Sequence, residues 1–248
     1  MSLRGILNLI SDIAEIKKTS TPYLCGGTPR DKLMNRLDNI VDIDITTGDS
    51  SVHLLAKEVS SMLPEASYKQ LGDGHAQVDI RGIKLDFSSN FLVPNIENIL
   101  KKAGLKNPSP MQCELYSRDF TCNALLMSLD LKVIKDPTGL GVTDIKRKLL
   151  RTCLPAHLTL KDQPKRVVRI LYLASKLGFE VDKEIIDWVK LHPESIMGAH
   201  KSSIIEKIHS ALNYDEAKTI RLLSEMNLWR YIPISPQIAA IMARHRKV

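Results

Sequence analysis

The sequence predicts an α+β protein: a head built from a mixed β-sheet with helices, followed by an all-helical region. Segments in which apolar and polar residues alternate, as in half-buried strands, lie in the first 135 residues. Apolar residues at helical spacing dominate from about residue 142 onward. Hydrophobic residues make up 44% of the 248 residues, enough for one sizeable core or two modest ones. We place the boundary between 1–148 and 149–248.

The elements of the head follow from these two periodicities and from turn residues. Leu3, Ile6 and Ile10 share a helix face, and Pro29 fits a first helical turn, where its missing N–H is not needed. In chain order the expected elements are a helix over 2–17, a strand over 23–25, a helix from 29 to about 37, a strand over 41–46, a helix over 52–62, a hairpin of strands 75–80 and 83–88, a connector over 89–116 with one short helix near 96–100, a helix over 120–127 and a strand over 133–135.

Positive charge gathers in the second half of the chain. The whole sequence has 35 Lys and Arg against 28 Asp and Glu, a net charge of +7. Residues 1–145 hold 16 basic and 18 acidic residues, whereas residues 146–248 hold 19 and 10. Such density favours a polyanionic partner, most commonly nucleic acid, although a solvated helix face explains it equally well.

Several classes of protein are excluded. No apolar run approaches the ~18 residues of a membrane span, and the N-terminus has no secretory signal pattern. The four cysteines form no CxxC pair, which indicates reduced, buried thiols. We therefore expect a soluble, cytoplasmic protein without a membrane partner.

Acidic residues on two strands indicate phosphoryl-transfer chemistry. Asp42 and Asp44 are two apart on one strand and so project from one face, and Asp86 lies on the polar face of a second strand. Adjacent carboxylates repel unless cations lie between them, as in enzymes that use paired Mg²⁺ ions. The turn at Gly26 and Gly27 lets backbone N–H groups approach a phosphate, and Arg30 follows it. Solvent-facing acids are the alternative interpretation.

Four motifs in order resemble the class II tRNA nucleotidyltransferase and bacterial poly(A) polymerase family. Residues 26–44 resemble its Gly-Gly-x-x-Arg-Asp and Asp-x-Asp motifs, 118–124 its RRDFTxNA segment, 136–144 its DPxxGLxDL turn, and 166–179 its RxLRxxRFxxRLGF helix. The resemblance covers roughly residues 20–180. It implies a nucleotidyltransferase-fold head and a helical neck that binds nucleotide and RNA.

The resemblance also implies roles for particular residues. Asp42 and Asp44 would hold two Mg²⁺ ions, and Asp86 would deprotonate or orient the RNA 3′-hydroxyl. The implied contacts to the nucleoside triphosphate are Gly26, Gly27, Arg30, Arg118, Asp119, Asn123, Arg166 and Arg169, with Asn123 supporting its own segment.

The sequence departs from the family pattern at the base-reading position. The family's EDxxR reads Asp162-Gln163-Pro164-Lys165-Arg166, so Gln163 stands where an Asp is usual. A carboxylate only accepts hydrogen bonds, whereas a Gln amide accepts or donates. We expect looser exclusion of U and G. An alignment with one inserted residue instead gives Asp162 the reading role. Ser117 and Tyr172 also replace family arginines.

The expected activity is template-independent addition of CMP and AMP, from CTP and ATP, to the 3′ end of tRNA, with release of pyrophosphate. Poly(A) synthesis is the alternative with the same chemistry, and a non-catalytic RNA-binding protein with this fold is the alternative from another class. Family members usually continue into further helical domains, whereas about 70 residues follow the resemblance here. We therefore expect either a compact enzyme or one that works with a protein partner or as a homo-oligomer.

Overall fold

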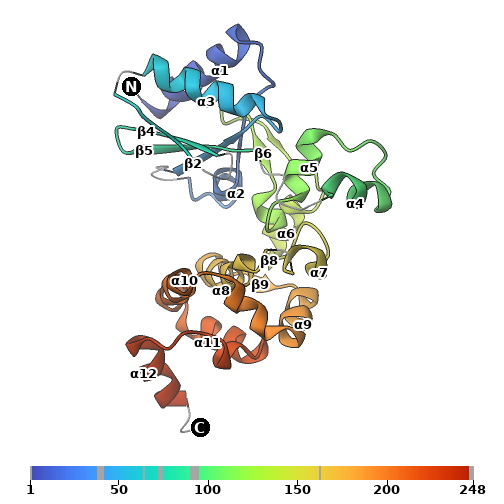
Figure 1. The fold of residues 1–248 in the computed structure, drawn as a ribbon, viewed down its shortest axis with the longest axis vertical. Coiled ribbons are helices and arrows are strands. Elements are labelled where there is room, and N and C mark those ends of the chain that lie inside the picture. Colours follow the sequence, from blue (N-terminus) through green and yellow to red (C-terminus); the bar gives the residue numbers. More distant parts are fainter. Residues whose placement is uncertain are drawn as a thin grey trace. The chain divides into compact units, whose positions relative to one another are not determined.

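A computed structural model describes residues 2–37, 42–63, 65–71, 75–89, 95–161 and 163–245 (Figure 1). Contacts between residues divide it into two compact units, Met1–Lys146 and Arg147–Val248. Each unit is described by itself below.

A seven-stranded mixed sheet is the centre of the first unit in its described residues. Its order is β3-β4-β5-β2-β1-β6-β7, in which β2 and β5 run parallel and the other neighbours antiparallel. The strands are β1 (Tyr23–Cys25), β2 (Asp42–Thr46), β3 (Ser67–Gln70), β4 (Ala76–Ile80), β5 (Ile83–Phe87), β6 (Leu126–Met127) and β7 (Ile134–Lys135).

Two helices cover one face of this sheet and form the core with it (Figure 1). In α1 (Leu3–Ile16), Ile6, Ile10 and Ile13 are buried, and in α3 (Ser51–Met62) the buried side chains are also three or four residues apart. They pack against strand residues such as Ile43. The other helices of the unit are α2 (Gly27–Leu33), α4 (Ile96–Lys102), α5 (Pro110–Tyr116), the 3-10 turn η1 (Thr121–Asn123) and α6 (Gly141–Arg147), which reaches the boundary.

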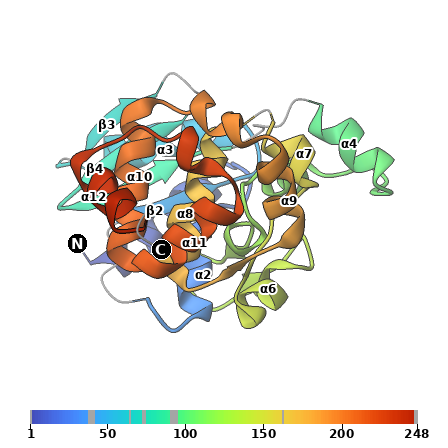
Figure 2. The same cartoon turned by 90° about the horizontal axis from the view of Figure 1, so that it is seen from below.

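The second unit is built from helices with one small sheet. The strands β8 (Leu149–Leu150) and β9 (Glu180–Val181) pair in parallel, and helical periodicity did not predict them. Helix α8 packs against α10 and α11 (Figure 2). The helical elements are α7 (Ala156–Thr159), α8 (Lys165–Leu177), α9 (Lys183–Leu191), η2 (Pro193–Gly198), α10 (Lys201–Tyr214), α11 (Glu216–Glu225), η3 (Leu228–Arg230) and α12 (Pro236–His245).

The α+β class with a mixed sheet is confirmed, whereas several local predictions are wrong. Residues 120–127 were expected to be helical, but they form η1 and β6. The connector over 89–116 contains α5, and the strand β3 was not predicted. Helix α2 begins at Gly27, two residues before Pro29, and ends at Leu33.

The structure also describes the cysteines and the length of the apolar helices. All four cysteines are buried, and none of them forms a disulfide. No helix in the described part of the chain is long and apolar enough to cross a membrane.

Candidate active site

The three predicted acids lie on one face of the sheet. Within β2, Ile43 and Ile45 are buried under α1 and α3, so Asp42 and Asp44 project from the opposite face. Strand β5 runs parallel to β2 with Asp86 directly beside Asp44 in register. Asp42 is exposed, and Asp44 and Asp86 are half-buried. The sheet therefore gathers carboxylates from two adjacent strands at an accessible surface.

A lysine accompanies these acids. Lys84, the register partner of Asp42, lies 2.7 Å from an Asp86 oxygen and 3.7 Å from an Asp42 oxygen. The hydrogen bond to Asp86 is the main cause that raises the pKa of Lys84. Among the described residues, no three His, Cys, Asp or Glu side chains are close enough together to hold a metal ion. The cation that bridges two of the acids here is thus the Lys84 ammonium.

Gly26 packs directly against the Asp44 carboxylate. Its backbone has φ 67° and ψ −127°, a region open to glycine but not to residues with a Cβ. A Cβ built at Gly26 would lie 1.9 Å from Asp44 Oδ2. The strand β1 brings the two together, because Cys25 pairs with Asp44. The predicted Gly-Gly turn therefore shapes the surroundings of an acid.

Arg30 is buried and engaged by protein groups. Its Nε and Nη2 donate to the two carboxylate oxygens of Asp31, at 2.8 and 3.0 Å, and its Nη1 donates to Asn123 Oδ1 at 2.6 Å. Asn123 Nδ2 in turn donates to Asp119 Oδ1 at 3.1 Å. These bonds tie α2 to the Asp119–Asn123 segment. The triphosphate contact of Arg30 stays a prediction, as do those of Asp119 and Asn123.

Arg118 belongs to a buried network that sequence reasoning missed. Its Nη2 donates to Glu114 Oε1 at 2.9 Å and to Cys25 Sγ at 2.8 Å. Glu114 is fully buried and accepts a further hydrogen bond from the Thr46 hydroxyl. Thr46 Oγ1 accepts from the Gly48 N–H at 2.9 Å. Glu114 lies one helical turn before Arg118, and this i,i+4 spacing of opposite charges was the signal available in the sequence.

Burial and charge act against each other in this network. Burial alone lowers the pKa of Arg118, but the groups around it, Cys25 and Glu114 foremost, outweigh burial and raise that pKa above its ordinary value. Burial raises the pKa of the Cys25 thiol well above its ordinary value. Arg118 is therefore charged at neutral pH. Asp44 contributes to both shifts, so the network lies close behind an acid of the site.

The segment 136–144 forms hydrogen bonds that connect α6 to the part of the chain that carries Asn123. Asp136 accepts from the Val142 N–H at 2.9 Å, near the start of α6, and from the Thr138 hydroxyl at 2.9 Å. Asp144 is buried and accepts from Thr121 Oγ1 at 2.7 Å. These bonds join α6 to the turn η1 that carries Asn123.

The remaining predicted residues lie in the second unit. Arg166 is buried in the first turn of α8 and its Nη1 donates to the Thr159 hydroxyl. Gln163 and Arg169 are half-buried, and the Gln163 N–H bonds to the Thr159 carbonyl at 3.2 Å. Arg166, Gln163 and Arg169 each have a further interaction within the protein. Asp162 lies outside the described residues.

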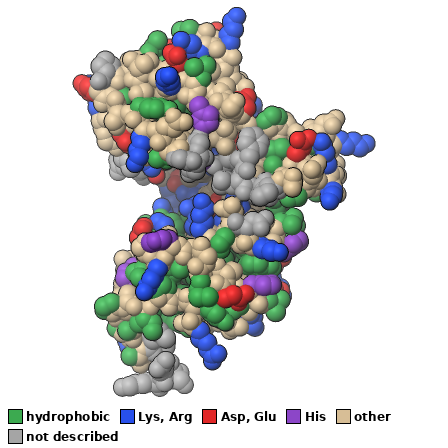
Figure 3. Space-filling model, viewed as in Figure 1, with side chains coloured by type: hydrophobic (Ala, Val, Ile, Leu, Met, Phe, Trp, Pro, Cys, Tyr) green, Lys and Arg blue, Asp and Glu red, His purple; other side chains and the backbone are tan. Residues whose placement is uncertain are grey.

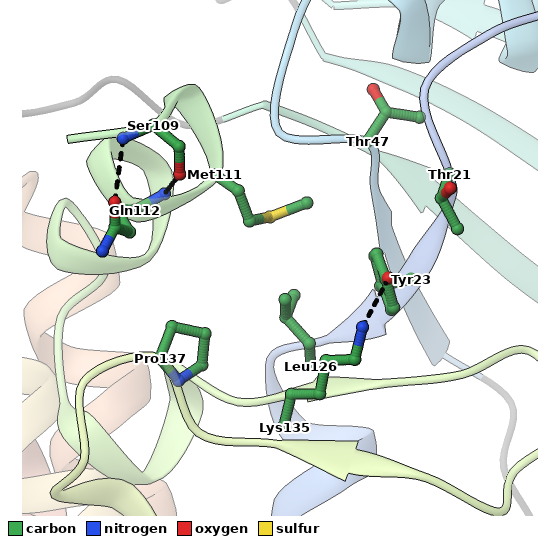
Figure 4. A pocket seen from close by; sticks show the side chains of 9 residues that line it. All are labelled: Thr21, Tyr23, Thr47, Ser109, Met111, Gln112, Leu126, Lys135 and Pro137. Carbon is green, nitrogen blue, oxygen red and sulfur yellow. Dashed lines mark hydrogen bonds between the residues drawn. The ribbon is translucent and has the colours of Figure 1, made fainter. Parts of the chain in front are cut away.

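A pocket of about 380 Å³ opens at the other end of β1 (Figure 4). Tyr23 lies there and pairs with Thr46, whereas Cys25 at the opposite end pairs with Asp44. Lys135 Nζ donates to the Tyr23 hydroxyl at 2.9 Å. None of the predicted site residues lines this pocket, so it is separate from the acids.

A comparison with known protein families shows which family this chain belongs to. Residues 22–151, which include the three acids and the 118–144 segments, match the family described as poly A polymerase head domain. The chain belongs to this family. The resemblance expected from the motifs is thereby confirmed, and the head domain accounts for β1 through β8.

Curated relatives match most of this chain and are longer than it. The chain is 27% identical over 243 residues to tRNA nucleotidyltransferase cca1 of Schizosaccharomyces pombe, covering 92% of this chain and 46% of the relative. It is 28% identical over 218 residues to a CCA-adding enzyme of Anoxybacillus flavithermus, covering 85% and 51%. The chain thus spans about half the length of these relatives.

Solved structures show the same fold. One described as a tRNA-processing enzyme in an apo form matches with a TM-score of 0.71 at 22% identity, covering 98% of this chain and 62% of that one. The Thermotoga maritima CCA-adding enzyme complexed with tRNA matches with a TM-score of 0.70 at 20% identity, covering 94% and 53%. At this identity the likeness establishes the fold.

Proposed function

We propose that this chain adds nucleotides to the 3′ end of RNA, with tRNA as the preferred acceptor and CTP and ATP as donors. The observation that carries the proposal is the group of three acids, Asp42, Asp44 and Asp86, on one accessible face of two adjacent strands, with Gly26 against Asp44. The names of the relatives, tRNA nucleotidyltransferase and CCA-adding enzyme, support the same activity.

Asp42 and Asp44 suit a pair of Mg²⁺ ions, because Mg²⁺ is usually bound by one or two carboxylates together with substrate phosphates and needs no third acidic side chain. Carboxylate oxygens are the donors that Mg²⁺ prefers, and the Lys84 ammonium already lies between Asp42 and Asp86 as a cation. We assign Asp42 and Asp44 as the residues that hold the metal. Bound Mg²⁺ would supply Lewis-acid stabilisation of the phosphate charge.

In the proposed reaction each of these protein groups would have its own role. Asp86 accepts the proton of, or orients, the RNA 3′-hydroxyl, whose oxygen attacks the α-phosphate. The new P–O bond forms as the bond to pyrophosphate breaks. Backbone N–H groups at Gly26 and Gly27 approach the triphosphate because no side chain intervenes. In this scheme the Arg30–Asn123–Asp119 chain keeps the phosphate side of the site in one conformation.

The two parts of the chain would have different tasks. We assign nucleotidyl transfer to 1–148 and the reading of base and RNA to 149–248. In the latter, Arg166, Arg169 and either Gln163 or Asp162 contact the base and phosphates. The excess of basic residues in 146–248 supports a polyanionic substrate.

The test is nucleotide addition by the purified full chain with Mg²⁺ and labelled CTP or ATP, singly and together. The acceptor is a tRNA transcript that lacks its CCA end, and products are separated on a sequencing gel. Addition that stops after C, C and A supports the proposal. A long ladder of A residues would replace it with poly(A) synthesis, and no addition from any mixture would overturn it.

A matched pair of variants tests the acids themselves. Asp44→Asn removes a charge at the proposed metal site, whereas Asp79→Asn removes one on the same sheet face, where Asp79 on β4 pairs in register with Lys84. We expect Asp44→Asn to lose addition by at least about 100-fold, in line with other transition-state charge interactions. Asp79→Asn should retain addition. Equal activity of both variants would contradict the assignment.

A further inference from the structure

Helix α8 presents a basic and aromatic stripe away from its core side. Lys165, Arg169, Tyr172 and Lys176 are spaced by four, three and four residues, so they share one helix face. Lys165 and Lys176 are exposed, and Arg169 and Tyr172 are half-buried. The buried residues of α8, such as Leu171, lie on the other side. No acid lies on this face.

A second stripe lies beside it on α10, which packs against α8 (Figures 1 and 2). Ser203, Lys207, Ser210 and Tyr214 have the same spacing, and Glu206 is the acid that borders this face. In Figure 3 separate Lys and Arg side chains, coloured blue, lie among hydrophobic and other side chains on the drawn face of this unit. Two neighbouring helices thus offer a polar, basic surface that contains two tyrosines.

Side-chain contacts join the two stripes into one cluster. The Tyr172 and Tyr214 rings meet edge to face, with centroids 6.0 Å apart. The ammonium groups of Lys207 and Lys176 lie 5.2 and 5.5 Å from the Tyr172 ring centroid. We name these four residues, Tyr172, Lys176, Lys207 and Tyr214, the tyrosine–lysine platform.

The platform differs from ordinary core packing. Tyr214 is 55% exposed, so much of its ring faces solvent. Lys207 forms an ion pair with Glu206, 2.9 Å away, while its ammonium also lies over the Tyr172 ring. Exposed aromatic rings flanked by cations provide a stacking surface for bases together with charge for phosphates.

We propose that the tyrosine–lysine platform binds a single-stranded segment of the RNA substrate, with a base stacked on Tyr214 and phosphates near Lys176 and Lys207. The inference rests on the proposed function, because it assigns part of the same substrate to this surface. Tyr172 is one of the positions at which this chain departs from the family pattern, so the platform is a feature of this sequence. An acidic protein partner would also form ion pairs with Lys176 and Lys207, but its carboxylates would not stack on the exposed Tyr214 ring.

Binding of a short unstructured RNA, labelled with fluorescein and followed by anisotropy, tests the platform in the full chain. Tyr214→Leu should weaken binding by about 5- to 100-fold, the usual cost of losing one stacked base. Tyr68→Leu is the matched aromatic control, since Tyr68 is 39% exposed on β3. Equal affinities of the two variants would overturn the proposal.

A pair of charge variants gives an independent readout. Lys176→Met with Lys207→Met should lower the slope of log affinity against log salt by about 1.4, or ~0.7 for each lost phosphate contact with a single strand. The control, Lys183→Met with Lys190→Met on α9, removes the same charge and should keep the slope. Polyglutamate that competes as well as RNA would overturn the proposal in favour of an acidic protein. Unchanged thermal unfolding of all variants excludes misfolding.

The outcomes separate this inference from the proposed function. A wild-type chain that binds no RNA would overturn both. Variants that add nucleotides and bind RNA as the wild type does would overturn the platform alone. The expected result is a raised KM for RNA with kcat unchanged in Tyr214→Leu.

Discussion

Gly26 and Asp44 show how one missing side chain shapes a site. The Asp44 carboxylate occupies the place where any Cβ at Gly26 would lie, 1.9 Å from its Oδ2. Two separate costs therefore oppose substitution of Gly26. One is backbone strain at φ 67° and ψ −127°, and the other is the collision with Asp44. The first depends only on residue 26, whereas the second needs both residues.

Gly26→Ala should therefore destabilise the fold less when Asp44 is already shortened. We expect Gly26→Ala to lower the free energy of unfolding by about 2–4 kcal/mol in the wild type, and by about 1–2 kcal/mol less in an Asp44→Ala background. Urea unfolding of the four proteins in this cycle measures the coupling. Additive effects would show that strain alone opposes the alanine. Nucleotide addition should be lost in Gly26→Ala, because Asp44 must move.

Gln163 tests how a single amide affects the choice of base. An amide both donates and accepts, whereas a carboxylate only accepts, so Gln163→Asp should strengthen discrimination against U and G. The expected gain is about 10-fold in the ratio of kcat/KM for CTP over UTP, the size of one hydrogen bond left unmade. Single-nucleotide incorporation measures this ratio. A wild-type chain that already excludes U and G strictly would contradict the prediction, and Asp162 would then be the reader.

At the scale of elements, helix α5 was not predicted from the sequence, yet it stabilises the site. Glu114 on α5 is fully buried and joins Arg118 to the Thr46 hydroxyl on β2. Removing one partner of a buried pair leaves the other charge without compensation, which typically costs 3–5 kcal/mol. The helix thus anchors the strand that carries Asp42 and Asp44.

Glu114→Gln should therefore lower the free energy of unfolding by about 2–4 kcal/mol, since the amide keeps the shape but not the charge. Glu97→Gln on α4 is the control, because Glu97 forms an exposed i,i+4 pair with Lys101 and should cost under about 0.5 kcal/mol. Urea unfolding of the two variants gives the comparison. Similar losses would mean that the buried network adds no stability.

The sequence pattern predicted the helices and strands that bury one face. It did not predict the segment whose residues are all buried, nor the helix that begins at a proline. The β4–β5 hairpin was predicted because Gln77 and Asp79 alternate with buried residues. Residues 120–127 are all buried, so no periodicity distinguishes helix from strand there. Helix α5 was missed because residues 89–116 were interpreted as a connector with one short helix near 96–100. In the structure Pro110 is the first residue of α5, after a capping box between Ser109 and Gln112.

The candidate site was predictable to the extent that its residues project from strands. Alternation placed Asp42, Asp44 and Asp86 on polar faces, and the parallel pairing of β2 with β5 brings them together. The hydrogen-bond partners could not be predicted, because Arg30 meets Asn123 across 93 residues of chain and Glu114 meets Thr46 across 68. Such contacts depend on the tertiary fold, which local spacing does not encode.

At the scale of the whole molecule, the distribution of charge predicts where RNA affinity resides. Residues 1–145 hold 16 basic and 18 acidic residues, whereas residues 146–248 hold 19 and 10. Phosphate contacts release counterions, so each contact makes affinity depend on salt. Neutralising those lysines of 146–248 that touch phosphates should therefore reduce both affinity and salt dependence, whereas the same change in the first unit should affect neither.

Two double variants with equal loss of charge test this asymmetry. Lys161→Met with Lys165→Met removes two exposed lysines from the second unit, and Lys101→Met with Lys102→Met removes two from α4 in the first. The first pair should lower the slope of log affinity against log salt by about 1.4–1.8, since each contact contributes ~0.7 on single strands and ~0.9 on duplexes. The second pair should keep the wild-type slope. Equal decreases of the slope in both double variants would mean that the net charge of the protein, rather than the position of the lysines, governs RNA binding. Long-range attraction depends on the total charge, whereas counterion release depends on which lysines touch phosphates.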